Sequence, residues 1–203
     1  MPFRALLLFV IAALFWGDQF SAQSPVRVRV ETEVGDIVVE VDQAKAPITA
    51  ANFLRYVDAG HYDGGNWHRT VKLDNQPESA VKIEVIQAAV NRARAKEGFG
   101  PITLERTSKT GLLHRDGTIS MARGAPDSAT SGWFICINDQ PSLDFGGARN
   151  PDGQGFAAFG RVVSGMDVVR RIQAAPSSTT RTTNAEAQRL TPPITIIKAT
   201  RVK

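Results

Sequence analysis

Two short stretches of this 203-residue sequence decide its fold: Trp67-His68-Arg69 and Gly117-Thr-Ile-Ser-Met-Ala-Arg123. The second stretch runs from a glycine through residues that favour strands, and Gly132 to Ile137 and Phe156 to Val163 have the same character. Apolar and β-branched residues bounded by Gly, Pro or Asp are typical of strands. The centre of the chain therefore predicts three strands, at 117–122, 132–137 and 156–163.

The segment toward the N-terminus predicts a β-hairpin. Valines alternate with charged residues from Val26 to Val30, and Ile37, Val39 and Val41 continue the spacing of two. Gly35-Asp36 lies between these two runs and favours a turn. Two runs of period two across a Gly-containing turn indicate a hairpin with one face in water.

Two segments have the spacing of helices. The first begins near Pro47 and ends at Gly60, with Phe53, Tyr56 and Val57 on one face. Proline in the first turn and glycine after the last are common at helix ends. The second, Gly165 to Ala174, places its apolar residues on one face in the same way.

The remaining segments complete an all-β pattern. We expect strands at Val81 to Val90 and Pro193 to Val202, and loops at 72–78, 91–100 and 176–191. Many short strands without a βαβ rhythm favour a largely antiparallel barrel. The prediction is one mainly β domain over 23–203.

The first residues predict export. Arg4 is followed by the apolar run Ala5 to Trp16, and the small residues Ser21 and Ala22 come after it. This order is typical of a signal peptide, and the apolar run is short for a transmembrane helix. We expect cleavage near Ala22, with 1–22 as the signal peptide and a periplasmic or secreted mature protein that is not inserted in the membrane. A retained N-terminal anchor is the alternative.

Composition and charge argue against several functions. The formal net charge is +4, and the basic residues are scattered without interleaved aromatics, so no nucleic-acid partner is expected. The single cysteine, Cys136, has apolar neighbours and is predicted to be a buried thiol. The three histidines lack metal-binding spacing, so neither a metal nor another cofactor is expected. Asp127 and Asp144 could form an acid–base pair, but aspartates beside glycines are more often turn residues.

The order of the motifs resembles one family over nearly the whole chain after residue 22. The chain is similar to the cyclophilin-type peptidyl-prolyl cis–trans isomerases, and to their exported bacterial branch in particular. The matching motifs are Thr32-Glu-Val-Gly-Asp-Ile37, Ala46-Pro47 with Asn52-Phe53, His61-Tyr-Asp-Gly64, Trp67-His68-Arg69, Gly117 to Arg123, Asp127 to Ser131, Trp133-Phe134-Ile135, Leu143-Asp144, Phe156 to Gly160 and Gly165 to Val169.

This resemblance implies an eight-stranded antiparallel β-barrel capped by two α-helices. It also implies rotamase activity on X-Pro bonds and a role in protein folding. Arg69 would be the catalytic residue, and Gln87 would hold the substrate backbone. Phe134, Leu143 and Phe156 would line the proline pocket with Val85, and Ala122 and Arg123 would form a strand edge for the substrate. The partners would be unfolded or partly folded polypeptides that contain proline, bound by a monomer.

Such a site suits the chemistry. Rotation about a peptide bond has a barrier of about 18–20 kcal/mol because the C–N bond is partly double. A catalyst must bind the twisted amide better than either planar form, which needs no nucleophile or metal. The twisted nitrogen regains a lone pair, to which a guanidinium can donate. No proton is transferred overall, so His68 is predicted to be a structural, hydrogen-bonding residue.

The sequence also departs from the family pattern near the groove. An insertion lies at roughly 71–82, Glu84 stands where phenylalanine is expected, and Ala88-Ala89 replaces Gly-Gly. Gly132 replaces glutamine and Ser142 an aromatic residue. We therefore expect a shallower, more polar groove, reduced activity and weak cyclosporin binding. The alternatives are a chaperone or adaptor that binds Pro-containing segments without turnover, and a barrel that uses its insertion to contact a partner.

Overall fold

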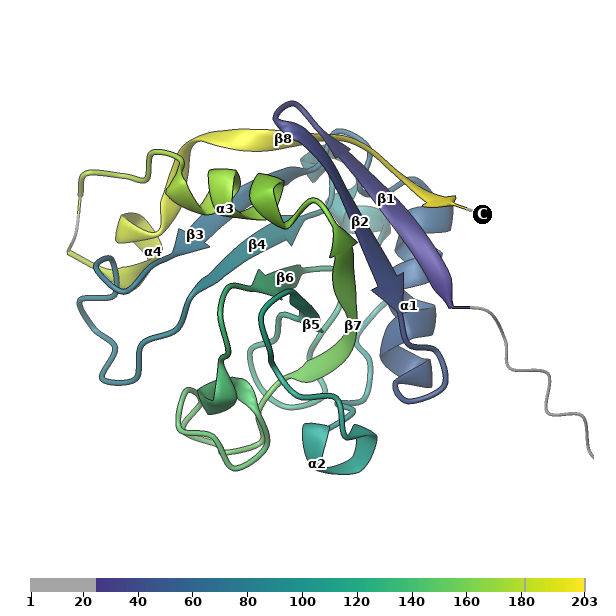
Figure 1. Ribbon diagram of the computed structural model, residues 1–203, viewed down its shortest axis with the longest axis horizontal. Coiled ribbons are helices and arrows are strands. Elements are labelled where there is room, and N and C mark those ends of the chain that lie inside the picture. The colour runs from purple at the N-terminus through teal and green to yellow at the C-terminus, as the bar shows by residue number, and fades with distance from the viewer. Residues whose placement is uncertain (1–24, 181, 203) are drawn as a thin grey trace, which may run out of the picture.

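Eight strands close into a barrel in the computed structural model, which describes residues 25–180 and 182–202 (Figure 1). The neighbours around the barrel follow the order β1-β2-β7-β5-β6-β4-β3-β8, and every pair is antiparallel. The fold class predicted from the sequence is thus confirmed. The strands are β1 (Val26–Thr32), β2 (Gly35–Val41), β3 (Asn66–Val71), β4 (Val85–Ala89), β5 (Thr118–Met121), β6 (Trp133–Cys136), β7 (Ala157–Ser164) and β8 (Arg189–Val202).

The two long helices pack on different strands of the barrel (Figure 1). Helix α1 (Pro47–Asp58) contacts β7 and β8, whereas α3 (Met166–Ala174) contacts β2, β3 and β4. Both were predicted, and both bury their apolar faces in the barrel core. The short elements are α2 (Thr107–Thr110), α4 (Asn184–Ala187) and the 3-10 turns Arg92–Glu97 and Pro141–Leu143.

The predicted hairpin is confirmed, but its turn is formed by Glu33 and Val34, and Gly35-Asp36, predicted as the turn, already belongs to β2. Val26 pairs with Val41 and Thr32 pairs with Gly35, so the alternating valines of β1 and β2 share one face. That face is buried, with Val28 and Val39 fully inside the barrel. The pattern succeeds because each strand faces the core on one side and water on the other.

Several boundaries differ from the predictions. Strand β3 carries Trp67 and Arg69 but has no clear alternation, and β4 is shorter than the predicted 81–90. Strand β8 begins at Arg189 and α4 lies before it, inside the segment predicted as loop. The predicted loop at 91–100 contains a 3-10 turn. The early part of β8 pairs with β3, which lies more than a hundred residues earlier in the chain. Pro192 and Pro193 argue against a strand in the sequence, because proline is uncommon inside strands.

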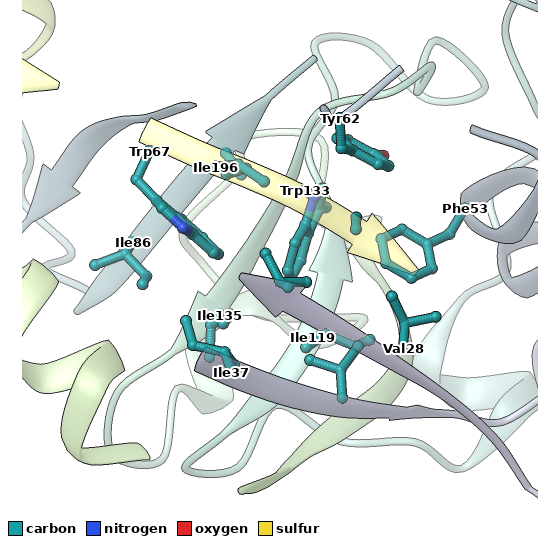
Figure 2. Close-up of a cluster of buried hydrophobic side chains, with 14 of the residues drawn as sticks. Val28, Ile37, Phe53, Tyr62, Trp67, Ile86, Ile119, Trp133, Ile135 and Ile196 are labelled. Carbon is teal, nitrogen blue, oxygen red and sulfur yellow. The ribbon is translucent and has the colours of Figure 1, made fainter. Parts of the chain in front are cut away.

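The barrel interior holds one continuous apolar cluster (Figure 2). The ring centroids of Trp67 and Trp133 are 5.0 Å apart, and those of Phe53 and Trp133 are 5.3 Å apart, both with edge contacts. Rings that meet edge to face at such spacings add to the free energy of burial. Within residues 25–180 and 182–202, no helix combines the length and apolar character that a membrane crossing requires. The predicted signal peptide and its cleavage site lie outside the described residues.

Candidate functional site

A bulge in β3 places the guanidinium of Arg69 on the outer surface of the barrel. Trp67 pairs with Ala88 and Arg69 with Gln87, so two residues of β3 span one step of β4. A bulge of this kind re-aims a side chain and is frequent beside active sites. Trp67 points into the core while Arg69 lies directly opposite Gln87 on the outer face.

Three hydrogen bonds fix Arg69. Its Nε and Nη2 donate to Gln188 Oε1 at 2.8 and 2.6 Å, and its Nη1 donates to Gln87 Oε1 at 2.7 Å. A guanidinium carries five N–H groups, so one on Nη1 and one on Nη2 remain for a ligand. Gln87 Oε1 is turned to the arginine, which leaves its Nε2 as a further donor.

The environment lowers the pKa of Arg69 to about 10, first through burial and then through the charge of Arg149. At neutral pH the guanidinium therefore stays charged, but it is only partly hydrated. A donor that is shielded from water interacts more strongly with a developing lone pair than one in bulk solvent.

A second apolar cluster forms the floor of the groove beside Arg69. It lies on the outer face of the same strands that line the core. Its buried members are Val71, Ile83, Val85, Phe134, Cys136 and Leu143, with Ala122 and Phe156 packed against them. Cys136 is buried in this cluster as predicted, and burial raises the pKa of its thiol well above the ordinary value. The rings of Phe134 and Phe156 meet edge to face with centroids 5.4 Å apart.

A chain of buried polar groups supports Phe134 from behind. The ring of His114 stacks on Phe134, its Nδ1 lies 2.7 Å from Asp144 Oδ1, and its Nε2 lies 2.9 Å from Ser120 Oγ. His114 and Ser120 are buried, so this group cannot act on a substrate as a Ser-His-Asp triad would. Asp127 instead accepts from the backbone of Leu104, so the two candidate carboxylates serve separate structural contacts.

Arg123 holds the wall of the groove. It donates to Asp152 Oδ2 at 2.7 Å and to the carbonyl of Gly155 at 2.7 Å, and it lies over the Phe156 ring. Its hydrogen bond holds the pKa of Asp152 at about 2. Gly155 has a φ of +66°, and a Cβ there would approach the Asp144 carbonyl carbon at 2.6 Å, so only glycine fits this turn.

The strand edge predicted at Ala122 and Arg123 is open on its outer side. Ala122 N–H donates to the Gly132 carbonyl, whereas none of the described backbone hydrogen bonds uses the Ala122 carbonyl or the Arg123 N–H. Such free groups can pair with an extended peptide.

All eight residues predicted for the site line one cavity of about 210 Å³. They are Arg69, Val85, Gln87, Ala122, Arg123, Phe134, Leu143 and Phe156. The volume lies below the range of about 300–1,000 Å³ that is usual for cofactors and drug-sized ligands, and suits a single small ring. The structure therefore brings the predicted residues together, while their individual roles stay predictions.

Sequence reasoning missed four residues of this site. Ile83, Arg149 and Asn150 line the same cavity, and Gln188 holds Arg69. Ile83 could have been found from its spacing of two from Val85 on one strand face. Arg149 and Asn150 lie in a loop and Gln188 follows α4, all distant from Arg69 in sequence, where no local pattern marks them.

The inserted loop supports the site without lining its cavity. Most of residues 72–78 lie at the surface, as predicted, but Asn75 and Gln76 are buried. Gln76 Nε2 donates to the carbonyls of Lys72 and Ile83, and its Oε1 accepts from Arg149 Nη1 at 2.9 Å. The Asn75 carbonyl accepts from Gln188 Nε2, so the loop also supports the glutamine that holds Arg69.

One of the predicted changes to the groove is wrong in position. Glu84 does not line the cavity, because its carboxylate accepts from Asn138 and from Gln173 at the end of α3. Side chains of an extended segment alternate between faces, so Glu84 and its neighbour Val85 point to opposite sides. The short side chain of Ser142 does not reach the cavity lining, and its effect on the groove stays a prediction.

Gly132 and His68 also matter near the site. A Cβ at Gly132 would lie 4.0 Å from Gln87 Nε2, so glycine there does remove a side chain from the groove.

Burial, and then the charge of Arg69, lower the pKa of His68, which leaves the imidazole neutral at pH 7. Its Nδ1 is buried without a hydrogen-bond partner, so the predicted hydrogen-bonding role is not met at that atom.

Within the described part of the chain, no three His, Cys, Asp or Glu residues are grouped so that they could hold a metal ion.

A second cavity of about 560 Å³ adjoins the groove and shares Arg69 and Gln87 with it. Its far side is formed by Glu78 and α4.

Comparison with known proteins identifies the family. The model of the cyclophilin type peptidyl-prolyl cis–trans isomerase family matches residues 27–201. The chain is 36% identical over 155 residues to peptidyl-prolyl cis–trans isomerase cyp18 of Streptomyces antibioticus, which covers 76% of this chain and 87% of that protein. It is 36% identical over 172 residues to a peptidyl-prolyl cis–trans isomerase of Acinetobacter baylyi, which covers 83% of this chain and 84% of that protein.

The fold also matches solved structures. A cyclophilin-type isomerase of Cryptosporidium parvum superposes with a TM-score of 0.67 at 20% identity, covering 88% of this chain and 98% of that one. At this identity the likeness concerns the fold alone.

Proposed function

The chain belongs to the cyclophilin-type peptidyl-prolyl cis–trans isomerases, and we propose that Arg69 is the group through which it accelerates rotation about X-Pro bonds. One observation carries this proposal. Arg69 is held rigidly by two glutamines at the edge of an apolar cavity, with two N–H groups left over. A proline ring in the cavity would place its nitrogen beside these donors.

The arrangement favours the twisted amide over the planar forms. In the planar amide the nitrogen lone pair is delocalised and accepts poorly, whereas rotation localises it. Only interactions that strengthen in the transition state raise the rate. The free donors of Arg69 meet this condition, and the apolar floor excludes the water that would compete for them.

Gln87 and the edge at Ala122 would hold the backbone on either side of the proline. Gln87 Nε2 is a free donor, and the Ala122 carbonyl and Arg123 N–H are free for strand-like pairing. Backbone pairing gives affinity without a sequence requirement, which suits an enzyme that acts on many unfolded chains.

Replacing Arg69 tests the assignment. We expect Arg69→Ala to lower kcat/KM by about 100- to 1,000-fold, the usual cost of removing one donor from a transition state. Exchange NMR on an Ala-Pro-Phe peptide measures the rate without a coupling protease. Arg201→Ala is the control, because Arg201 is paired with Asp58 on α1, outside the groove. A variant Arg69→Ala that keeps more than half of the activity would exclude Arg69 as the catalytic group.

We further propose that the activity is lower than is typical of the family. The missing side chain at Gly132 supports this, because it would have faced Gln87 in the groove. Gly132→Gln should raise kcat/KM and leave the fold unchanged. Weak cyclosporin binding stays a prediction, to be checked by titration calorimetry.

The substrates that we propose are exported polypeptides. The support is the sequence of residues 4–22, with its basic start, apolar run and small residues. Mass spectrometry of the mature N-terminus tests export. A start near Gln23 supports it, and an intact Met1 on the purified protein contradicts it.

A further inference from the structure

The groove contains two arginines whose charges no carboxylate of the described residues balances. Arg123 is paired with Asp152, but neither Arg69 nor Arg149 takes part in any ion pair among the described residues. Arg149 donates only to neutral oxygens, those of Gln76 and of the Val81 backbone. Two guanidinium groups thus line one cavity of about 210 Å³ without a counter-ion.

Hydrogen bonds from both its side chain and its backbone hold Arg149 in position. Its Nη1 donates to Gln76 Oε1 at 2.9 Å and to the Val81 carbonyl at 2.5 Å. Gln76 is itself buried, and its amide is saturated by the backbone of Lys72 and Ile83. The backbone N–H of Arg149 donates to the carbonyl of Ser142, which ties the residue to the turn that carries Leu143.

Arg149 keeps donors for a ligand. Both of its described side-chain bonds use Nη1, so its Nε and Nη2 have no acceptor among the described residues. The neighbouring Asn150 also lines the cavity, and its Nδ2 is buried without a partner. Buried donors without acceptors are rare because each costs free energy, so an acceptor supplied from outside would be bound favourably.

The free energy of binding should be more favourable for an anionic acceptor than for a neutral one. Arg149 is half-buried and lies close enough to Arg69 for its charge to lower the pKa of that residue. Two like charges held in one apolar groove are costly until an opposite charge arrives. A carboxylate can accept two parallel N–H bonds from a guanidinium, which are stronger than bonds to a neutral amide.

We propose that Arg149 is a specificity residue that selects X-Pro segments with an acidic side chain within two residues of the proline. The proposal rests on the function proposed above, since the proline must occupy the cavity that Arg149 borders. Arg149 is attached to the loop between β3 and β4, whereas the edge at Ala122 and Arg123 follows β5. In the barrel order β5-β6-β4-β3 these lie on opposite sides of the cavity floor. The acidic residue therefore lies on the side of the proline away from that strand edge.

Matched peptides test the preference. Three peptides share one sequence around Ala-Pro-Phe and carry Glu, Gln or Lys at one neighbouring position, and a second set carries them on the other side of the proline. For one of the two positions we expect kcat/KM by exchange NMR to be about five- to tenfold higher for Glu than for Gln, a difference of about 1–1.4 kcal/mol in the free energy of the transition state. Lys should be the poorest. A Glu/Gln ratio near one at both positions overturns the proposal.

Variants assign the preference to Arg149. Arg149→Gln should bring the Glu/Gln ratio to about twofold or less, as weak residual attraction from Arg69 implies, whereas Arg149→Lys keeps the charge and should keep part of the ratio. Arg201→Gln removes a charge near the end of β8, which is paired with Asp58 and lies outside the cavity, and should leave the ratio unchanged. An unchanged ratio in Arg149→Gln would assign the selectivity elsewhere and contradict the proposal.

Two further readouts keep the test decisive. If Arg149→Gln does not fold, the Glu/Gln ratio in the unaltered protein must still decrease between low salt and about 0.5 M salt, by less than for an exposed pair because Arg149 is half-buried, and a ratio that does not change with salt contradicts the proposal. If no peptide is turned over, the proposed function fails by itself. The Glu/Gln difference can then still be measured as a ratio of Kd values by NMR titration, and its absence there overturns the present inference.

Discussion

The inner and outer faces of the same strands perform different tasks. In β6, Trp133 and Ile135 point into the barrel core, while Phe134 and Cys136 point outward into the groove floor. In β4, Ile86 and Ala88 belong to the core and Val85 to the groove floor. The period of two lets adjacent residues contribute to stability and to binding separately.

The two apolar clusters differ in how they are closed. In the interior, aromatic rings and aliphatic side chains pack against one another, as the neighbours of Trp133 show (Figure 2). The outer cluster is open on one side, and arginines border that opening. Substitutions in the inner cluster should therefore mainly lower stability, because only the protein packs against it. Substitutions in the outer cluster should mainly lower activity, because we propose that the substrate packs against it.

The largest expected effect is on the inner face. Trp133→Ala should lower the free energy of unfolding by about 3–5 kcal/mol, because the barrel cannot collapse around so large a cavity. Urea unfolding followed by circular dichroism measures this. A loss below roughly 1 kcal/mol would mean that the core is not closed in the way described.

For Phe134, the adjacent residue on the outer face, we expect a larger loss of activity and a smaller loss of stability than for Trp133. Phe134→Ala should lower kcat/KM by about tenfold or more, as the loss of one apolar pocket wall implies. The cost in stability should be smaller than that of Trp133→Ala, at about 2 kcal/mol, because water can fill an open site. Paired unfolding and exchange experiments on both variants check the contrast, and equal losses of stability would remove it.

The pH dependence should report the charge on Arg69. Burial and Arg149 lower its pKa to about 10, and the donor is active only when protonated. Activity should hold up to pH 9 and then fall with a midpoint near the pKa of about 10. Below that pH the buried charge lowers the free energy of unfolding, and this loss is relieved as the pH rises above the folded pKa, because the guanidinium loses its proton in the folded state before it does so in the unfolded chain. Exchange NMR with circular dichroism at each pH is the measurement, and constant activity to pH 11 in folded protein would contradict it.

The smallest effect is expected at Glu84. Its carboxylate accepts from Asn138 and Gln173, away from the groove. Glu84→Gln should change kcat/KM by less than about twofold and stability by no more than about 1 kcal/mol, as for other part-exposed polar groups. A large change in activity would show that the groove extends behind β4.

Local patterns predicted the elements that have one solvent-exposed face and one buried face. The hairpin of β1 and β2 and the helix α1 were found because their apolar residues recur at two and at three to four positions. The start of β8 was missed because its pairing with β3 is long-range and its prolines suggest a loop. The N-terminus of α1 depends similarly on Glu105, whose carboxylate accepts from the backbone of Ile48 and Thr49.

The sequence by itself determined the family, because its short motifs follow one another in the family's order, and this resemblance implied the barrel and the eight residues that line the groove. The tertiary structure alone decided what surrounds Arg69. Gln188, Arg149 and the buried Asn75 and Gln76 come from segments distant in the chain, and they meet only when β3, β8 and the loop after Leu143 are packed together. Hydrogen bonds between such distant groups leave no local pattern, since each residue alone is an ordinary polar residue in a loop or at a strand end.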